Sequence, residues 1–140
     1  MAYTVPDGAH LAAAAKRVYD LQETGTAGPE MGRTVAVLLA SVVRDVLTDC
    51  DHAAPFDAAA LELTAYSGTA ATVAATGTYW TAAGEPRELT ADDRAELNHW
   101  AYRLDHPGAR SGWEPLCTVL SPGAVTRYRL DLARAAAALS

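Results

Sequence analysis

Apolar residues recur with the period of an α-helix along the first part of the chain. The stripe consists of Leu11, Ala14, Ala15, Val18 and Leu21, spaced three and four residues apart. Pro6 and Asp7 suit a helix start, and Gly25 suits its end, because glycine readily adopts the left-handed conformation of a C-cap. The pattern therefore predicts a helix over residues 7–24.

The next apolar segment is wider than one face of a surface helix. Pro29 fits a first helical position and Glu30 complements the positive helix end, so a second helix is predicted over residues 29–49. Its main face is formed by Met31, Val35, Leu38, Leu39, Val42 and Val46. A flank extends this face sideways with Ala36, Ala40, Val43 and Leu47. Together they cover an arc of roughly 200°, against about 100° for an ordinary surface helix. Either other helices or a second copy of the chain must cover the flank.

The middle of the chain supports two interpretations. Helical spacing over residues 57–77 competes with strand-like alternation of Leu61, Leu63 and Ala65, and we favour the helix. Residues 77–89 read as a short hairpin, because strand formers precede a turn segment. Trp80 on this hairpin joins Ala36, Ala40, Val43 and Leu47 as a candidate contact residue, since large rigid side chains bury much area on binding.

Three further helices are predicted in the second half. Thr90 and Asp93 resemble a capping box ahead of a helix that ends near His106. Ser121 and Pro122 then suit the start of a terminal helix, and a short helix covers residues 115–120. The predicted fold is mainly α, a compact single-domain bundle (residues 1–140) of about five helices around the apolar helix 29–49, with a β-hairpin near 77–89. The alternative is an α+β fold with strands within residues 60–81.

Composition and charge limit the kinds of partner and the cellular compartment expected for the chain. The chain has 31 alanines, no isoleucine and a net charge of −6, and its residues 1–102 carry 6 basic and 14 acidic side chains. This distribution disfavours general nucleic-acid binding. Cys50 and Cys117 lack paired spacing, no secretion signal is seen, and the apolar stretch 35–43 is too short to span a bilayer. We expect a cytoplasmic protein without membrane contact.

The densest group of chemically versatile side chains lies between His99 and Glu114. The candidate ligand-binding residues there are His99, Arg103, His106, Arg110 and Trp113. Imidazoles beside guanidiniums could bind an anionic metabolite or move protons. A solvated outer helix face explains the same residues, and we favour that interpretation. Known phosphate-loop, dinucleotide and hydrolase motifs are lacking. Adjacent Asp49, Cys50, Asp51 and His52 do not have metal-site spacing, so neither a metal nor a cofactor is expected.

The C-terminal segment suggests a helix-turn-helix. In such a motif, Thr126, Arg127 and Arg129 would lie at the start of a recognition helix and contact DNA. Ordinary ion-pair spacing on a solvent-facing helix explains the arginines equally well.

The sequence therefore favours a non-enzymatic interaction or regulatory module that associates with itself through the second helix or binds another protein. A helix-turn-helix DNA-binding regulator is the first alternative. A small enzyme or binding protein for an anionic metabolite is the second.

Overall fold

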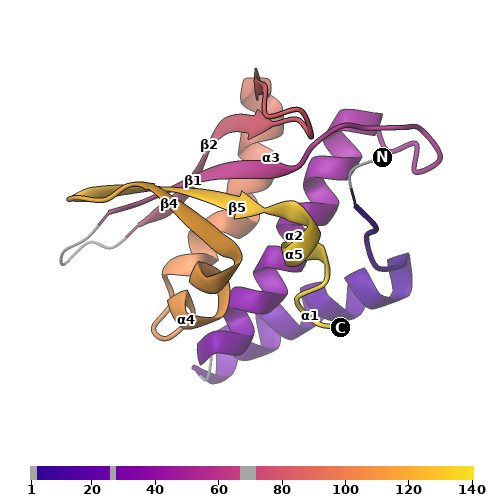
Figure 1. Ribbon diagram of the computed structural model, residues 1–140. Coiled ribbons are helices and arrows are strands. Elements are labelled where there is room, and N and C mark those ends of the chain that lie inside the picture. Colours follow the sequence, from indigo (N-terminus) through magenta and orange to yellow (C-terminus); the bar gives the residue numbers. More distant parts are fainter. Residues whose placement is uncertain (1–2, 26–27, 67–71) are drawn as a thin grey trace.

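Two helices, three strands, a second helical segment, two more strands and a short last helix follow one another along the part of the chain that the structure describes. The computed structural model describes residues 3–25, 28–66 and 72–140, and its elements are labelled in Figure 1. The helices in these ranges are α1 (Gly8–Thr24), α2 (Gly28–Thr48), α3 (Ala91–Ala101), α4 (Arg110–Trp113) and α5 (Leu132–Ala136). Two 3₁₀ turns are η1 (Tyr102–Asp105) and η2 (Glu114–Leu116). The strands are β1 (Ala60–Tyr66), β2 (Val73–Trp80), β3 (Pro86–Glu88), β4 (Cys117–Ser121) and β5 (Val125–Asp131).

The prediction of a mainly helical bundle is wrong, and the α+β alternative fits the structure. β1 and most of β2 replace the helix favoured over residues 57–77. Alternating side chains explain this, because Leu61, Leu63 and Ala65 all point to one buried face. The predicted terminal helix and the short helix at 115–120 are largely replaced by β5 and β4. The predicted hairpin near 77–89 is present as the pair β2 and β3.

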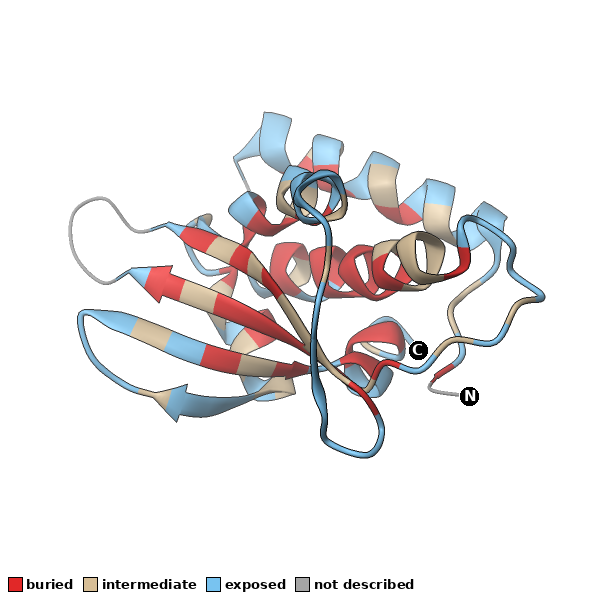
Figure 2. Cartoon of the chain, turned by 90° about the horizontal axis from the view of Figure 1, so that it is seen from above, coloured by how far each residue is buried: buried red, intermediate tan, exposed pale blue. Residues whose placement is uncertain are grey.

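The five strands form one antiparallel sheet in the order β3-β2-β1-β5-β4. β1 lies at the centre and pairs with β5 without interruption, from Ala60 opposite Asp131 to Tyr66 opposite Val125. The helices cover one face of this sheet (Figures 1 and 2). Consequently, inward-facing strand residues are apolar, whereas the opposite face carries charged residues and threonines.

The core is built around α2, which other helices surround on several sides (Figure 2). Its buried positions continue around the helix and include four of the six residues of the predicted face and three of the four of the predicted flank, while Val42, Val46 and Leu47 are half-buried. α4 approaches α2 so closely that two glycines are required. A Cβ atom at Gly32 would lie 2.1 Å from the carbonyl oxygen of Ala109, and one at Gly112 would lie 2.0 Å from that of Pro29.

Several helix boundaries predicted from the sequence are confirmed. The side chain of Asp7 caps α1 by accepting a hydrogen bond from the His10 amide, and Gly25 ends the helix with φ of 69°. Thr90 caps α3 by accepting from the amide of Asp93 at 3.1 Å. Each of these capping signals lies within one helical turn, so the helix ends can be predicted from the sequence without knowledge of the fold.

Candidate interaction surface

β4 forms one edge of the sheet and consists of five uncharged residues, Cys117–Ser121. One side of the strand pairs with β5, and no described strand pairs with the other side. A register shift between Val119 and Ser121 makes Leu120 the extra residue of a bulge. Val119 is 50% exposed and Leu120 is 40% exposed. An edge strand of this kind offers unpaired backbone groups together with apolar side chains.

The opposite edge of the sheet is protected against pairing. β3 has only three residues, and these are Pro86, Arg87 and Glu88, all exposed. Proline has no N–H to donate, and two charges side by side disfavour an incoming strand. Where β3 ends, the side chain of Asn98 from α3 pairs with the backbone of Ala75 in β2. The two edges therefore differ sharply, and only β4 lacks charge and proline within the strand.

More exposed apolar side chains gather at the same end of the sheet. Tyr66 and Val125 lie opposite each other on β1 and β5, and both are exposed. Val119 pairs with the buried Tyr128 and therefore faces the helix side, whereas Tyr66 and Val125 face the other side at the same end of the sheet. Figure 1 shows that this end of the sheet extends beyond the helical layer. Clusters of exposed apolar side chains of this kind often mark contacts with other proteins.

The structure corrects the predicted helix-turn-helix. Thr126, Arg127 and Arg129 lie on β5, so the recognition helix that would carry them does not exist. The physical reason is pairing with β1 and β4, which satisfies the backbone of residues 125–131 on both sides.

Both arginines instead contribute to the outer sheet face. The Nη2 atom of Arg127 lies 2.5 Å from Oε2 of the buried Glu62, and the hydroxyl of Thr76 donates to Oε1 of the same carboxylate at 2.7 Å. The guanidinium of Arg129 stacks over the ring of Trp80, 5.0 Å from its centroid. Trp80, a predicted contact residue, is accordingly half-buried. These contacts tie three neighbouring strands together across one face.

The predicted ligand residues divide into two separate groups. Arg103, only 4% exposed, holds its guanidinium 4.6 to 5.2 Å from the centroids of Tyr102, Trp100 and Tyr19. Its Nη1 donates to the carbonyl of His99, whose ring packs edge-on against Trp100. This cluster fastens α3 and η1 to α1. The contribution of Tyr19 was not foreseen, because it comes from a helix some eighty residues earlier.

The second group belongs to the core around α4. Trp113 is fully buried and its indole N–H donates to the carbonyl of Leu104 at 3.0 Å. Arg110 lies over the Trp113 ring and 3.8 Å from Glu114. His106 ends η1 and is half-buried. The two described hollows are lined by other residues. The five predicted ligand residues therefore do not line a common pocket among those described.

The predicted contact flank of the second helix is used inside the chain. Ala36, Ala40 and Val43 are 0% exposed, and Leu47 is half-buried against the core. The chain's own helices and sheet thus provide the cover that the wide apolar arc requires. A second copy has no access to these three side chains.

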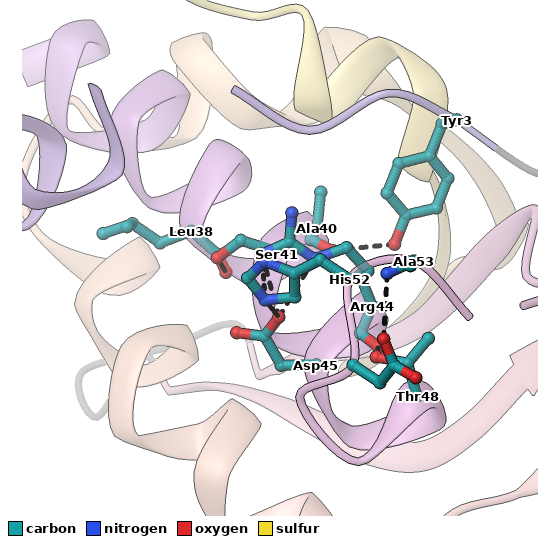
Figure 3. Close-up of polar contacts among 10 residues, drawn as sticks. Tyr3, Leu38, Ala40, Ser41, Arg44, Asp45, Thr48, His52 and Ala53 are labelled. Carbon is teal, nitrogen blue, oxygen red and sulfur yellow. Dashed lines mark hydrogen bonds and ion pairs between the residues drawn. The ribbon is translucent and has the colours of Figure 1, made fainter. Parts of the chain in front are cut away.

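Another polar cluster lies at the end of α2 (Figure 3). Oδ1 of Asp45 accepts from Arg44 at 2.8 Å and faces Nε2 of His52 at 2.9 Å. The hydroxyl of Tyr3 donates to the carbonyl of Ala40 at 2.7 Å, which anchors the N-terminal segment beside a hollow of about 380 Å³. Burial raises the pKa of Tyr3 well above its ordinary value. The contacts among Arg44, Asp45 and His52 hold the segment after α2 against the end of that helix.

The structure gives no metal site at residues 49–52, which follow α2. Asp49 and Cys50 adopt positive φ angles of 52° and 61° as the chain leaves the helix. Among the described residues, no three histidine, cysteine or acidic side chains come together to hold a metal ion.

The β4–β5 hairpin was missed from the sequence although a signal was present. Residues 117–121 and 125–131 are rich in β-branched and apolar residues, and Ser121, Pro122 and Gly123 between them are typical of turns.

No family model matches the chain, and comparison with curated proteins and with solved structures finds no similar protein. Within the described residues, no helix is both long enough and apolar enough to cross a membrane.

Proposed function

We propose that this chain is a non-enzymatic interaction module that associates with a second copy of itself through the β4 edge. The observation that carries the proposal is the difference between the two sheet edges. β3 combines a proline, two charges and short length, whereas β4 exposes Val119 and Leu120 and carries no charge. The bulge at Leu120 interrupts the β4 edge locally, but proline and charge protect the β3 edge alone, as expected where the β4 edge has a pairing role.

A second copy suits this edge for electrostatic and geometric reasons. Two-fold symmetry places a strand opposite itself in antiparallel orientation, so the residue on the axis faces its own copy and the others face residues of the same short strand. The chain has a net charge of −6, which would oppose self-association through a charged strand. Cys117–Ser121 avoids this repulsion, and its threonine, valine, leucine and serine are compatible across the pair. One continuous sheet would then run through both copies.

The expected affinity is moderate. Fully burying a valine or leucine stabilises an assembly by roughly 1.5–3 kcal/mol, and about half of that is still available at Val119 and Leu120. Four such side chains contribute in a symmetric pair, together with new backbone hydrogen bonds. Lost translational and rotational freedom opposes these terms. These terms nearly balance, so we expect a weak dimer with a dissociation constant no tighter than micromolar.

Sedimentation velocity over a wide micromolar concentration range tests the proposal. The wild-type protein should shift from monomer to dimer as its concentration rises. Val119→Lys and Leu120→Lys should remain monomeric, because each places like charges across the two-fold axis. Ala12→Lys adds the same charge at an exposed position on α1 and should dimerise like the wild type.

Two results would contradict the proposal. One is a wild-type protein that stays monomeric over the whole range. The other is dimerisation that persists in both β4 variants while circular dichroism shows them folded.

The alternative functions have weaker structural support. A helix-turn-helix requires a helix where β5 lies. An enzyme that uses His99 or His106 requires one of them to face a ligand site, and neither lines the two described hollows. Neither is proposed.

A further inference from the structure

A groove of about 800 Å³ lies between α1 and the C-terminal segment. Ala13 and Ala14 of α1 line one wall, and Ala136 and Ala137 line the other. α2 provides the floor with buried Thr34 and Val37, and residues 4–7 border one end. Figure 1 shows the two chain ends on this side of the molecule, away from the protruding end of the sheet.

Small side chains explain why the groove is open. α1 and α5 both pack on α2, and alanines face the space that remains between them. A methyl group reaches too short a distance to fill that space, whereas leucine at the same positions would close it. Several larger apolar residues, including Val5, Pro6 and Leu139, complete the lining. The result is a concave and mainly apolar surface.

The charged groups in the lining neutralise one another. Nε of Arg17 lies 2.6 Å from Oε2 of Glu30, and Nη2 lies 2.9 Å from Oε1, so the pair is bidentate. The hydrogen bond from Arg17 lowers the pKa of Glu30, which keeps this carboxylate ionised beside its partner. Oδ1 of Asp7 lies within hydrogen-bond distance of the His10 ring, 2.7 Å from Nδ1, so this carboxylate also has a partner within the lining. A charged ligand would have to break one of these pairs to find a partner in the lining.

We infer that this groove binds an uncharged, mainly apolar small molecule. Its volume falls within the range of roughly 300–1,000 Å³ that is typical of small-molecule sites, which are also predominantly apolar with a few polar groups. The paired charges at the rim select against ions, and the alanine walls accept an aliphatic or aromatic body. The hydroxyl of Thr34 donates to the carbonyl of Glu30 at 2.8 Å, and its oxygen can still accept a hydrogen bond from a neutral ligand.

The neutral dye N-phenyl-1-naphthylamine provides a direct probe, because its fluorescence rises in an apolar environment. Titration into the wild-type protein should give saturable binding to one site. Ala13→Phe places a ring within the groove and should weaken binding by about tenfold or more. Ala12→Phe is the matched control, since Ala12 is the exposed neighbour and lies outside the lining. It should bind the dye like the wild type.

Charge selectivity is tested with the anionic dye 8-anilino-1-naphthalenesulfonate. This dye should bind the wild-type protein more weakly than the neutral dye by about tenfold. The inference is overturned by absent or non-saturable binding of the neutral dye, by equal binding to the two phenylalanine variants, or by equal binding of the two dyes. Val119→Lys should leave dye binding unchanged, so a failed groove and a failed β4 interface are distinguishable.

Discussion

The side chain of Asn98 takes the place of a neighbouring strand beside β2. β3 pairs only with Thr78–Trp80, so the backbone of Ala75 lies beyond its reach. The amide of Ala75 donates to Oδ1 of Asn98 at 2.8 Å, and Nδ2 of Asn98 donates to the carbonyl of Ala75 at 3.1 Å. Because Ala75 is buried, water has little access to either group once Asn98 is removed.

We expect Asn98→Ala to lower the free energy of unfolding by about 2–4 kcal/mol. Each lost hydrogen bond contributes about 1 kcal/mol net, and each backbone group left unpaired in a buried position adds a desolvation cost of similar size. Urea denaturation followed by circular dichroism measures the change. The midpoint should fall while the slope of the transition stays constant, because the surface exposed on unfolding is almost unchanged.

Two further substitutions separate hydrogen bonding from loss of side-chain volume. Asn98→Asp keeps the shape and one acceptor but places an oxygen against the carbonyl of Ala75, so it should also destabilise. Glu96→Ala, at an exposed position on the same helix, should change stability by less than about 0.5 kcal/mol. If Asn98→Ala is as stable as Glu96→Ala, the edge of β2 does not depend on Asn98 and the reasoning fails.

Three other features of the structure lead to further predictions. Gly112→Ala should destabilise by several kcal/mol or prevent folding, because its Cβ would lie 2.0 Å from the carbonyl oxygen of Pro29; thermal denaturation measures this. Tyr3→Phe should cost about 1 kcal/mol in urea, since it removes one buried hydrogen bond. Burial raises the pKa of the Cys117 thiol to about 12, so at pH 9 a thiol reagent should label exposed Cys50 much faster. The same shift means that stability falls as pH rises from about 9 towards 12, because only the unfolded thiol loses its proton.

Each of these predictions has a matched control. Gly8→Ala should be tolerated, because nothing lies within 4 Å of its Cβ position. Tyr66→Phe alters an exposed ring and should leave stability unchanged. Equal stability of Gly112→Ala and the wild type would argue against the close approach of α4 to α2. Equal labelling rates for the two thiols in the folded protein would argue against burial of Cys117.

The helices near the N-terminus could be predicted because their signals are local. Asp7 and Gly25 mark the ends of α1, and Thr90 marks the start of α3, through contacts within one turn. The wide apolar arc of α2 correctly indicated a helix that needs cover on several sides. These features depend on short-range geometry and on the apolar character of single side chains, which the sequence states directly.

The candidate interaction surface could not be predicted in the same way. An edge strand is defined by strand order, and the order β3-β2-β1-β5-β4 joins β1 to a segment about sixty residues further along. In isolation, the spacing of Val125, Tyr128 and Leu132 fits a helix, whereas the alternation of Tyr128 and Leu130 fits a strand. The hydrogen bonds offered by β1 on one side and β4 on the other decide between the two.

By itself, the sequence determined the first two helices, the capped start of α3 and the burial of α2. It left open what covers α2, and the tertiary structure shows that the chain's own elements do so. It also left open which apolar residues stay exposed; four of the exposed ones that the structure describes, Tyr66, Val119, Leu120 and Val125, lie on β1, β4 and β5. The physical reason is range: helix capping and periodicity act over a few residues, whereas sheet order, edge exposure and the groove between α1 and α5 arise only when distant segments meet.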